Sequence, residues 1–207
     1  MKISGDDVRT GKRDLKDGRA CKTIEERTGI TREQFVDIYK DTMDLPEWKQ
    51  RIEKWDFCIP SYGRSAILPV MKDGRIVMVR QYRNALERET LEIPAGCRDS
   101  KTEDTAYCAA REMEEETGYR STNVKHLLSL RTTVAFCDEA VDIFVATDLE
   151  VGTRHLDEAE SIDVEIYTLE ELCDMIYEGK IQDGKTIAAI MAYAAAKKGG
   201  MGKHLDL

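Results

Sequence analysis

Residues 103–117 constrain this chain more than any other segment, because they follow the period of an α-helix and stop at Gly118. Three glutamates of this segment, Glu112, Glu115 and Glu116, stand at positions i, i+3 and i+4. On a helix they would lie within an arc of roughly 100°, so three carboxylates would share one face. Like charges at this spacing destabilise an isolated helix. The pattern predicts either a solvated acidic face or carboxylates gathered for divalent cations, and Mg²⁺ prefers such oxygen ligands.

The rest of the chain after residue 56 predicts a sheet covered by helices. On the predicted helix, small and apolar residues lie away from the glutamates and can pack on a sheet: Ala106, Ala109, Ala110 and Met113. Short runs rich in Val and Ile predict strands at 65–71, 75–80, 90–93, 124–130, 141–146 and 164–167. The expected fold class is α/β (α+β), with a mixed β-sheet sandwiched between helices.

Turn and capping residues add detail to this prediction. Asp73-Gly74 separates the first two predicted strands and is a hairpin signal. Thr168 and Glu171 form a capping-box pair that would open a helix reaching about residue 177. An alanine-rich segment at 187–198, followed by two glycines, predicts a last helix.

The first 56 residues differ in character and are expected to form a separate extension. Residues 1–20 are rich in charge and glycine, which predicts poor order. The pairs Thr23 with Glu26 and Thr31 with Gln34 fit the capping-box pattern, which predicts a helix that starts after Thr31, and Pro46 fits the first turn of a helix. The expectation is a partly disordered and then helical extension over 1–56, followed by one domain over 57–207.

Charge and cysteine usage limit the partners and the compartment. The formal net charge is −9, and an acidic surface repels long nucleic acids. No apolar run is long enough for a membrane span. Six cysteines form no CxxC pair, which predicts free thiols in a reducing cytoplasm. A small phosphate-bearing molecule stays compatible with these features if cations offset the charge.

The residues around the predicted glutamate helix form a longer pattern. Pro94-Ala95-Gly96 leaves a strand, a loop follows, and the helix ends at Gly118. This resembles the Nudix box: Gly, five residues, Glu, seven residues, Arg-Glu, apolar, any, Glu-Glu, any, Gly, apolar. The matching residues are Gly96, Glu103, Arg111, Glu112, Met113, Glu115, Glu116, Gly118 and Tyr119. One departure is that six residues separate Gly96 from Glu103. The resemblance implies a Nudix fold for residues 57–207.

The resemblance also implies roles within the box. Glu112 and Glu116 would be the main metal ligands, Glu115 an additional one, and the backbone carbonyl of Ala95 would join them. The metal would be Mg²⁺, with Mn²⁺ as the alternative. Glu103 and Arg111 would orient the loop and the helix by ion pairing, and Gly96 and Gly118 would be structural.

Outside the box, the chain is similar to the ADP-ribose pyrophosphatase branch of the family. The similar segments are Val79-Arg80-Gln81-Tyr82-Arg83, Leu91-Glu92-Ile93-Pro94-Ala95-Gly96, Phe136-Cys137-Asp138-Glu139, Leu156-Asp157-Glu158-Ala159-Glu160 and Asp183-Gly184-Lys185-Thr186-Ile187. The resemblance implies hydrolysis of ADP-ribose to AMP and ribose 5-phosphate, with Arg83 and Glu92 binding substrate. Arg83 could grip a phosphate with two N–H groups, or it could be an ordinary surface arginine. Another nucleotide-sugar is the second choice of substrate.

The loop at 157–160 would complete the active site. In related enzymes a glutamate here activates the attacking water or completes the metal site. Glu158 is assigned as the base and Glu160 as a metal ligand, although the reverse assignment and a solvated loop stay open. A different class is a non-catalytic Nudix domain that senses ADP-ribose, but such proteins usually lack box glutamates and carry a DNA-binding module.

Two departures from the branch concern the substrate pocket. The branch often has a proline before Phe136, whereas residues 132–135 here contain none. Relatives usually begin with strands that exchange across a homodimer and help hold the base, whereas this N-terminus is predicted to be helical. Trp48 and Trp55 could stack on an adenine or lie in a core. A homodimer is therefore left open.

Overall fold

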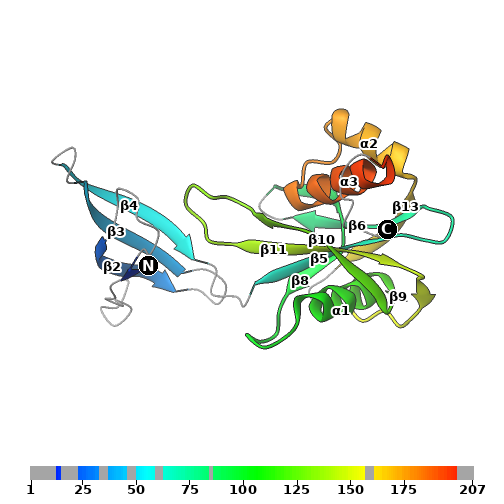
Figure 1. Cartoon of the computed structure of the whole chain (residues 1–207), viewed down its shortest axis with the longest axis horizontal. Coiled ribbons are helices and arrows are strands. Elements are labelled where there is room, and N and C mark those ends of the chain that lie inside the picture. The colour runs from blue at the N-terminus through cyan, green and yellow to red at the C-terminus, as the bar shows by residue number, and fades with distance from the viewer. Residues whose placement is uncertain are drawn as a thin grey trace. The chain divides into compact units, whose positions relative to one another are not determined.

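The chain forms two compact units, described here from a computed structural model (Figure 1). The structure describes residues 13–14, 23–32, 37–45, 50–58, 63–83, 86–156 and 161–199. One unit combines Met1–Ser61 with Thr133–Glu139, and the other combines Tyr62–Thr132 with Ala140–Leu207. No helix among the described residues is long and apolar enough to cross a membrane.

The N-terminal unit contains a four-stranded antiparallel sheet in which the strands follow chain order. Its strands are β1 (Arg13–Asp14), β2 (Thr23–Arg32), β3 (Asp37–Leu45) and β4 (Gln50–Cys58). The prediction of a helical N-terminal segment is therefore wrong for these residues. Pro46 and Trp48 lie outside the described residues.

The composition of β2 explains the error. Its ten residues, TIEERTGITR, include five β-branched side chains and Gly29 at an interior position. β-Branched residues favour strands, and an interior glycine costs a helix about 1 kcal/mol. A capping box is a pattern of only two residues. Here the strand propensity of the neighbouring residues of β2 outweighs it. The N-terminus was predicted to be helical and therefore different from that of the relatives. The described N-terminal residues form strands instead.

The described residues of the second unit form two main sheets and one short ribbon. The first sheet has the order β10-β11-β5-β8, built from β5 (Arg64–Pro69), β8 (Ala95–Cys97), β10 (Asn123–Arg131) and β11 (Ala140–Thr147). It is mixed, because β11 runs parallel to β5 while the other pairs are antiparallel. The second sheet is antiparallel, with β6 (Ile76–Arg83) between β13 (Ile162–Tyr167) and β7 (Arg88–Glu92). The ribbon pairs β9 (Tyr119–Arg120) with β12 (Glu150–Val151).

The predicted hairpin at Asp73-Gly74 is only partly correct. The turn is present, since Gly74 has φ +86° and its N–H donates to the carbonyl of Met71 at 2.9 Å. However, β5 and β6 are joined by the single bridge Val70↔Ile76 and then enter different sheets. Both strands have side chains buried on both faces, which fits interior strands of two sheets better than a two-stranded ribbon.

All three helices predicted in this unit are present. The helix α1 (Thr105–Thr117) starts after Asp104, whose side chain accepts two backbone N–H groups, and ends at Gly118 with φ +76°. The helix α2 (Leu169–Tyr177) has the predicted capping box between Thr168 and Glu171. The helix α3 (Gly184–Lys197) begins three residues before the predicted start, because Asp183 caps it.

The first sheet lies between α1 on one face and α2 and α3 on the other (Figure 1). Alternation along β5 and β11 produces this arrangement, since successive side chains point to opposite faces. Ile67 and Phe144 pack with Ala109 and Met113 of α1. Their neighbours in sequence pack on the other side, with residues of α3: Ala66, Leu68, Ile143 and Val145 against Ala189 and Ile190. The mixed sheet between helices is therefore confirmed, and α1 is fixed against it by its apolar side.

Candidate active site

The carboxylate of Glu112 lies directly against the backbone of Gly96. A β-carbon placed on Gly96 would come within 2.1 Å of both Cδ and Oε1 of Glu112. Real Cβ atoms never approach other atoms this closely, so position 96 must be glycine if the carboxylate keeps its place. Gly96 lies in β8, directly after Ala95. This contact therefore places the carboxylate of Glu112, one predicted metal ligand, against β8.

Arg83 and Glu116 belong to two different elements, and the charge of Glu116 acts on Arg83. Glu116 is on α1 and is only 4% exposed, while Arg83 ends β6. Hydrogen bonds to Glu92 are the main reason why the pKa of Arg83 is raised, and the charge of Glu116 adds to this effect. A cation that could bind a phosphate is therefore within electrostatic reach of a predicted metal ligand.

Arg111 holds the glutamate helix to the loop before it. Its Nη1 donates to Glu112 Oε1 at 3.0 Å and to Glu115 Oε2 at 2.8 Å. Its Nε donates to Glu103 Oε1 at 3.2 Å, and its Nη2 donates to the carbonyl of Cys97 at 3.0 Å. The three glutamates keep the pKa of Arg111 raised although burial acts in the opposite direction. Arg111 thus fixes three acidic side chains in one geometry.

Glu103 completes this connection despite the extra loop residue. Its second oxygen accepts the N–H of Asp99 at 2.7 Å, and its carbonyl accepts Nε of Arg98 at 2.7 Å. The side chain of Glu103 is 9% exposed. The longer loop therefore closes on itself and still delivers Glu103 to Arg111.

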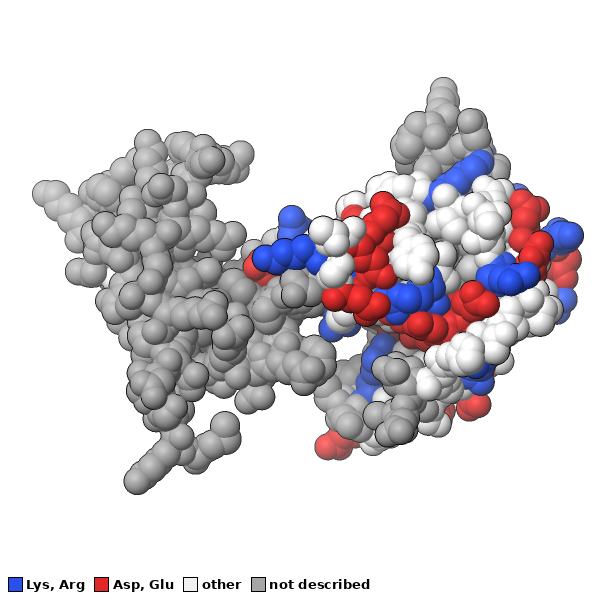
Figure 2. Space-filling model, turned by 90° about the horizontal axis from the view of Figure 1, so that it is seen from below, with Lys and Arg blue, Asp and Glu red and all other residues white. Residues whose placement is uncertain are grey.

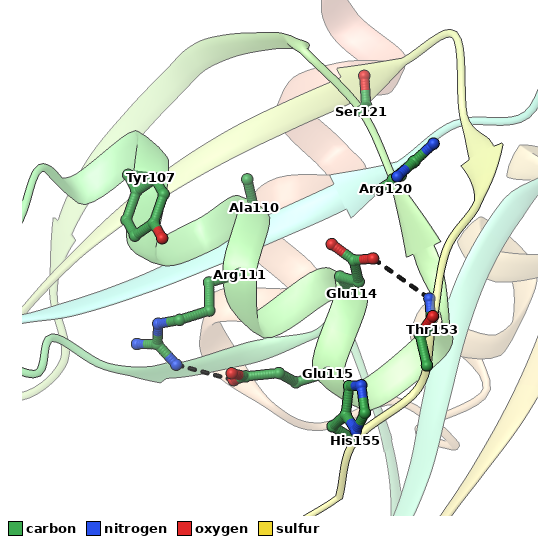
Figure 3. Close-up of a pocket in the computed structure, with 9 residues that line it drawn as sticks. All are labelled: Tyr107, Ala110, Arg111, Glu114, Glu115, Arg120, Ser121, Thr153 and His155. Carbon is green, nitrogen blue, oxygen red and sulfur yellow. Dashed lines mark hydrogen bonds and ion pairs between the residues drawn. The ribbon is translucent and has the colours of Figure 1, made fainter.

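Glu115 lies at the border between the glutamate face and an outer pocket of about 410 Å³ (Figure 3). Its side chain is 37% exposed and points to Arg111. The pocket is lined by Tyr107, Ala110, Arg111, Glu114, Glu115, Arg120, Ser121, Thr153 and His155. Ala110 lines this pocket, contrary to the prediction that it packs on the sheet. Glu115 is therefore less enclosed than Glu112 and Glu116.

The chain after β12 is attached to the C-terminal end of α1. The N–H of Gly152 donates to the carbonyl of Gly118 at 2.7 Å, and that of Thr153 donates to Glu114 Oε1 at 3.2 Å (Figure 3). Nε of Arg154 donates to the carbonyl of Glu116 at 2.8 Å. The bonds to the carbonyls of Gly118 and Glu116 occupy backbone groups that a helix end leaves without partners. The predicted Glu158 and Glu160 follow within 157–160, outside the described residues.

Glu92, a predicted substrate-binding residue, is buried behind Arg83. Its two oxygens accept Nε and Nη2 of Arg83, both at 2.7 Å. Lys185 Nζ donates to Oε2 at 2.5 Å, and Thr90 Oγ1 donates to Oε1 at 2.7 Å. Glu92 is 3% exposed, whereas the side chain of Arg83 is 42% exposed. Arg83 is thus the member of this group that a ligand can reach. Lys185 belongs to one of the segments that resemble the branch, but the sequence assigned no role to it.

The buried Glu92 should make stability depend on pH. Burial alone would raise the pKa of Glu92, but its bonds to Arg83 and the charge of Lys185 outweigh burial and lower it from 4.5 to about 2. A depressed pKa stabilises the folded state above pH 4.5, and this stabilisation is lost as the pH falls toward 2. The difference between these two pKa values corresponds to about 3 kcal/mol of unfolding free energy.

Denaturant unfolding at pH 5 and pH 2.5 checks this expectation. The wild-type protein should lose about 2–3 kcal/mol more unfolding free energy over this interval than Glu92→Gln. If the two proteins lost equal unfolding free energy over this interval, the pKa of Glu92 would not be lowered in the folded state, contrary to this prediction.

The ligand atoms of the predicted metal site are carboxylate and carbonyl oxygens, which is the set that a hard divalent cation takes. Within the described part of the chain, no group of three or more His, Cys, Asp and Glu side chains is close enough to hold a metal ion. Glu112 and Glu116 would therefore depend on substrate, water or the loop at 157–160 for further ligands. On the side where α1 lies, acidic side chains gather in a band with basic ones among them (Figure 2). The donor chemistry fits a cation.

Comparison with known proteins identifies the family of this chain. Residues 61–190 match the NUDIX domain family. An ADP-ribose pyrophosphatase from Bacillus subtilis is 37% identical, covering 82% of this chain and 92% of the relative. A methanol dehydrogenase activator from Bacillus methanolicus is 35% identical with the same coverage. The chain therefore belongs to the Nudix family and is a Nudix hydrolase.

A solved structure also supports the fold. The crystal structure of an ADP compounds hydrolase superposes with a TM-score of 0.71 and covers 84% of this chain and 93% of that one. Its sequence is 19% identical to this chain, so the likeness shows the fold alone. The prediction of a Nudix fold is confirmed.

Proposed function

We propose that this protein hydrolyses the diphosphate bond of a nucleoside diphosphate sugar with Mg²⁺, and that ADP-ribose is converted to AMP and ribose 5-phosphate. The carboxylate of Glu112 against Gly96 is the observation that carries this proposal, because it brings a box glutamate to the strand exit. The relative named ADP-ribose pyrophosphatase supports the choice of substrate. Another nucleotide-sugar is the alternative. The complete set of box glutamates argues against a non-catalytic sensor.

The residues divide the work of the reaction among them. Mg²⁺, or Mn²⁺, would be held by Glu112, Glu116 and the carbonyl of Ala95, with Glu115 and Glu160 as further ligands, and would supply positive charge and an activated water. Arg83 donates hydrogen bonds to a phosphate oxygen. Glu158 accepts a proton from the water, and the oxygen of that water attacks one phosphorus. The bond between this phosphorus and the bridging oxygen then breaks. Arg111 and Glu103 keep the helix and loop in place.

The compartment and partners of the protein are part of the proposal. The substrate is a small molecule, and a net charge of −9 opposes a long nucleic acid. Four cysteines in the described part are free thiols, which suits a cytoplasmic protein: Cys97, Cys108, Cys137 and Cys173. A homodimer, which the resemblance to the ADP-ribose pyrophosphatase branch implies, is also proposed.

A substrate panel tests the proposed activity. Nucleoside diphosphate sugars are incubated with the full chain and Mg²⁺, and the products are separated by ion exchange. ADP-ribose should have the highest kcat/KM and should yield AMP. A chelator should abolish turnover, and added Mg²⁺ should restore it. Full turnover by metal-stripped protein would overturn the metal mechanism, and a preference for another sugar would select the alternative substrate.

The roles of Glu158 and Glu160 can be separated by their metal dependence. Removing a general base should lower kcat by about 100- to 10,000-fold. Glu158→Gln should do this with little change in the Mg²⁺ concentration required, whereas Glu160→Gln should raise that concentration. The opposite outcome would exchange the two roles. If neither variant changed kcat by about threefold, the base would have to be sought within the box, beginning with Glu115.

A further inference from the structure

The first turn of α3 is fixed by its capping residue, Asp183. Oδ2 of Asp183 accepts the N–H of Thr186 at 3.0 Å, the hydroxyl of Thr186 at 2.5 Å and Nζ of Lys185 at 2.9 Å. These residues belong to a segment that resembles the ADP-ribose pyrophosphatase branch, yet the roles assigned above do not include them. One carboxylate oxygen thus orients two consecutive side chains.

Both of these side chains bind the end of β7. Thr186 Oγ1 accepts the N–H of Ile93 at 3.0 Å, and Thr186 is fully buried. Lys185 Nζ donates to Glu92 Oε2 at 2.5 Å. Ile93 is followed directly by Pro94-Ala95-Gly96, which includes the predicted metal-binding carbonyl and the glycine beneath Glu112. The start of α3 is therefore bonded to the strand that leads into the box.

Lys185 and Arg83 share one oxygen of Glu92. Nη2 of Arg83 reaches Oε2 at 2.7 Å, and Nζ of Lys185 reaches the same atom at 2.5 Å. The side chain of Lys185 is 15% exposed, compared with 42% for Arg83. The two cations therefore differ in position, since Lys185 is enclosed by Glu92 and Asp183 while Arg83 is open to a ligand.

We infer that Lys185 is a positioning residue for the diphosphate site. It neutralises part of the charge of Glu92 and fixes the side chain of Glu92, which in turn holds the guanidinium of Arg83 through two hydrogen bonds. Without Lys185, the whole charge of Glu92 would fall on Arg83 and draw the guanidinium away from the substrate. This inference rests on the proposed role of Arg83 in binding phosphate.

A double-mutant cycle tests the inference with a binding readout. The probe is α,β-methylene-ADP, a nucleoside diphosphate that is not hydrolysed at this bond, titrated by calorimetry into the full chain with Mg²⁺. Lys185→Met should weaken binding by about 10-fold, the scale of one hydrogen bond to a charged group. Arg83→Ala should weaken it at least as much. Because Lys185 acts through Arg83, the double variant should bind no more than about twofold worse than Arg83→Ala alone.

Several outcomes separate this role from others. If the losses of affinity in the two single variants multiplied in the double variant, Lys185 would bind the phosphate itself. If Lys185→Met bound the probe like the wild type, its ion pair with Glu92 would be purely structural. Either result overturns the inference. Lys185→Arg should recover most of the affinity. Lys180→Met is the matched control, because Lys180 forms an exposed pair with Glu178, and it should bind like the wild type. Thermal unfolding of each variant identifies losses that are due to misfolding.

The same experiment distinguishes the inference from the proposed activity. If the wild type hydrolyses no substrate of the panel but shows the expected cycle with α,β-methylene-ADP, the positioning role stands and the proposed activity fails. If the wild type hydrolyses ADP-ribose and the cycle is additive, the activity stands and the positioning role fails.

Discussion

Replacing Gly96 with alanine is expected to lower kcat by about 100-fold while the fold stays intact. The new methyl group would occupy the place of the Glu112 carboxylate, 2.1 Å from Cδ. The side chain of Glu112 is 14% exposed and bonded to Arg111, so it has little room to move without breaking that bond. A displacement of about 1 Å at a reacting centre can cost about 100-fold in rate.

Steady-state kinetics with saturating Mg²⁺ measures this effect, and circular dichroism and thermal unfolding check the fold. Gly184→Ala is the matched control, because the added methyl group there meets no atom within 4 Å. This control should keep kcat within about twofold. Wild-type kcat in Gly96→Ala would mean that the position of Glu112 against β8 is unimportant for the reaction.

The sequence predicted the elements whose signals are local. The helix α1 follows from its period and its end at Gly118, and the capping box of α2 is read from Thr168 and Glu171 alone. The same kind of signal failed at Thr23 and Glu26, where the β-branched content of β2 decides for a strand. A capping pair is therefore informative only when the chain that follows it also favours a helix.

The contacts that give the candidate site its shape could not be predicted in this way. The box pattern identifies Gly96 and Glu112, but only their packing shows that a β-carbon at position 96 would displace the Glu112 carboxylate. Glu92 and Lys185 are 93 residues apart in sequence, and no local pattern pairs them. Such contacts depend on how β7, β8 and α3 pack, which a periodicity argument does not determine.

Glu112→Gln and Glu116→Gln are each expected to lower kcat by about 100- to 1,000-fold. Each substitution removes a charged oxygen ligand, and a bound metal ion contributes several kcal/mol to the transition state, with each 1.4 kcal/mol equal to tenfold in rate. Glu116 is 4% exposed, so the amide of glutamine would occupy the same enclosed position without the charge. The fold should change little, because the substitution conserves shape.

Glu103→Gln is the matched comparison, since Glu103 is also enclosed and bonded to Arg111 but belongs to the loop before the helix. It should destabilise the protein by about 1.5–3 kcal/mol, the range for hydrogen bonds to charged groups, and lower kcat much less than the other two variants. Steady-state kinetics at saturating Mg²⁺, with denaturant unfolding of each variant, makes the comparison. If Glu103→Gln reduced kcat more than Glu116→Gln, the assignment of metal ligands along α1 would be wrong, and the loop would have to provide the ligand instead.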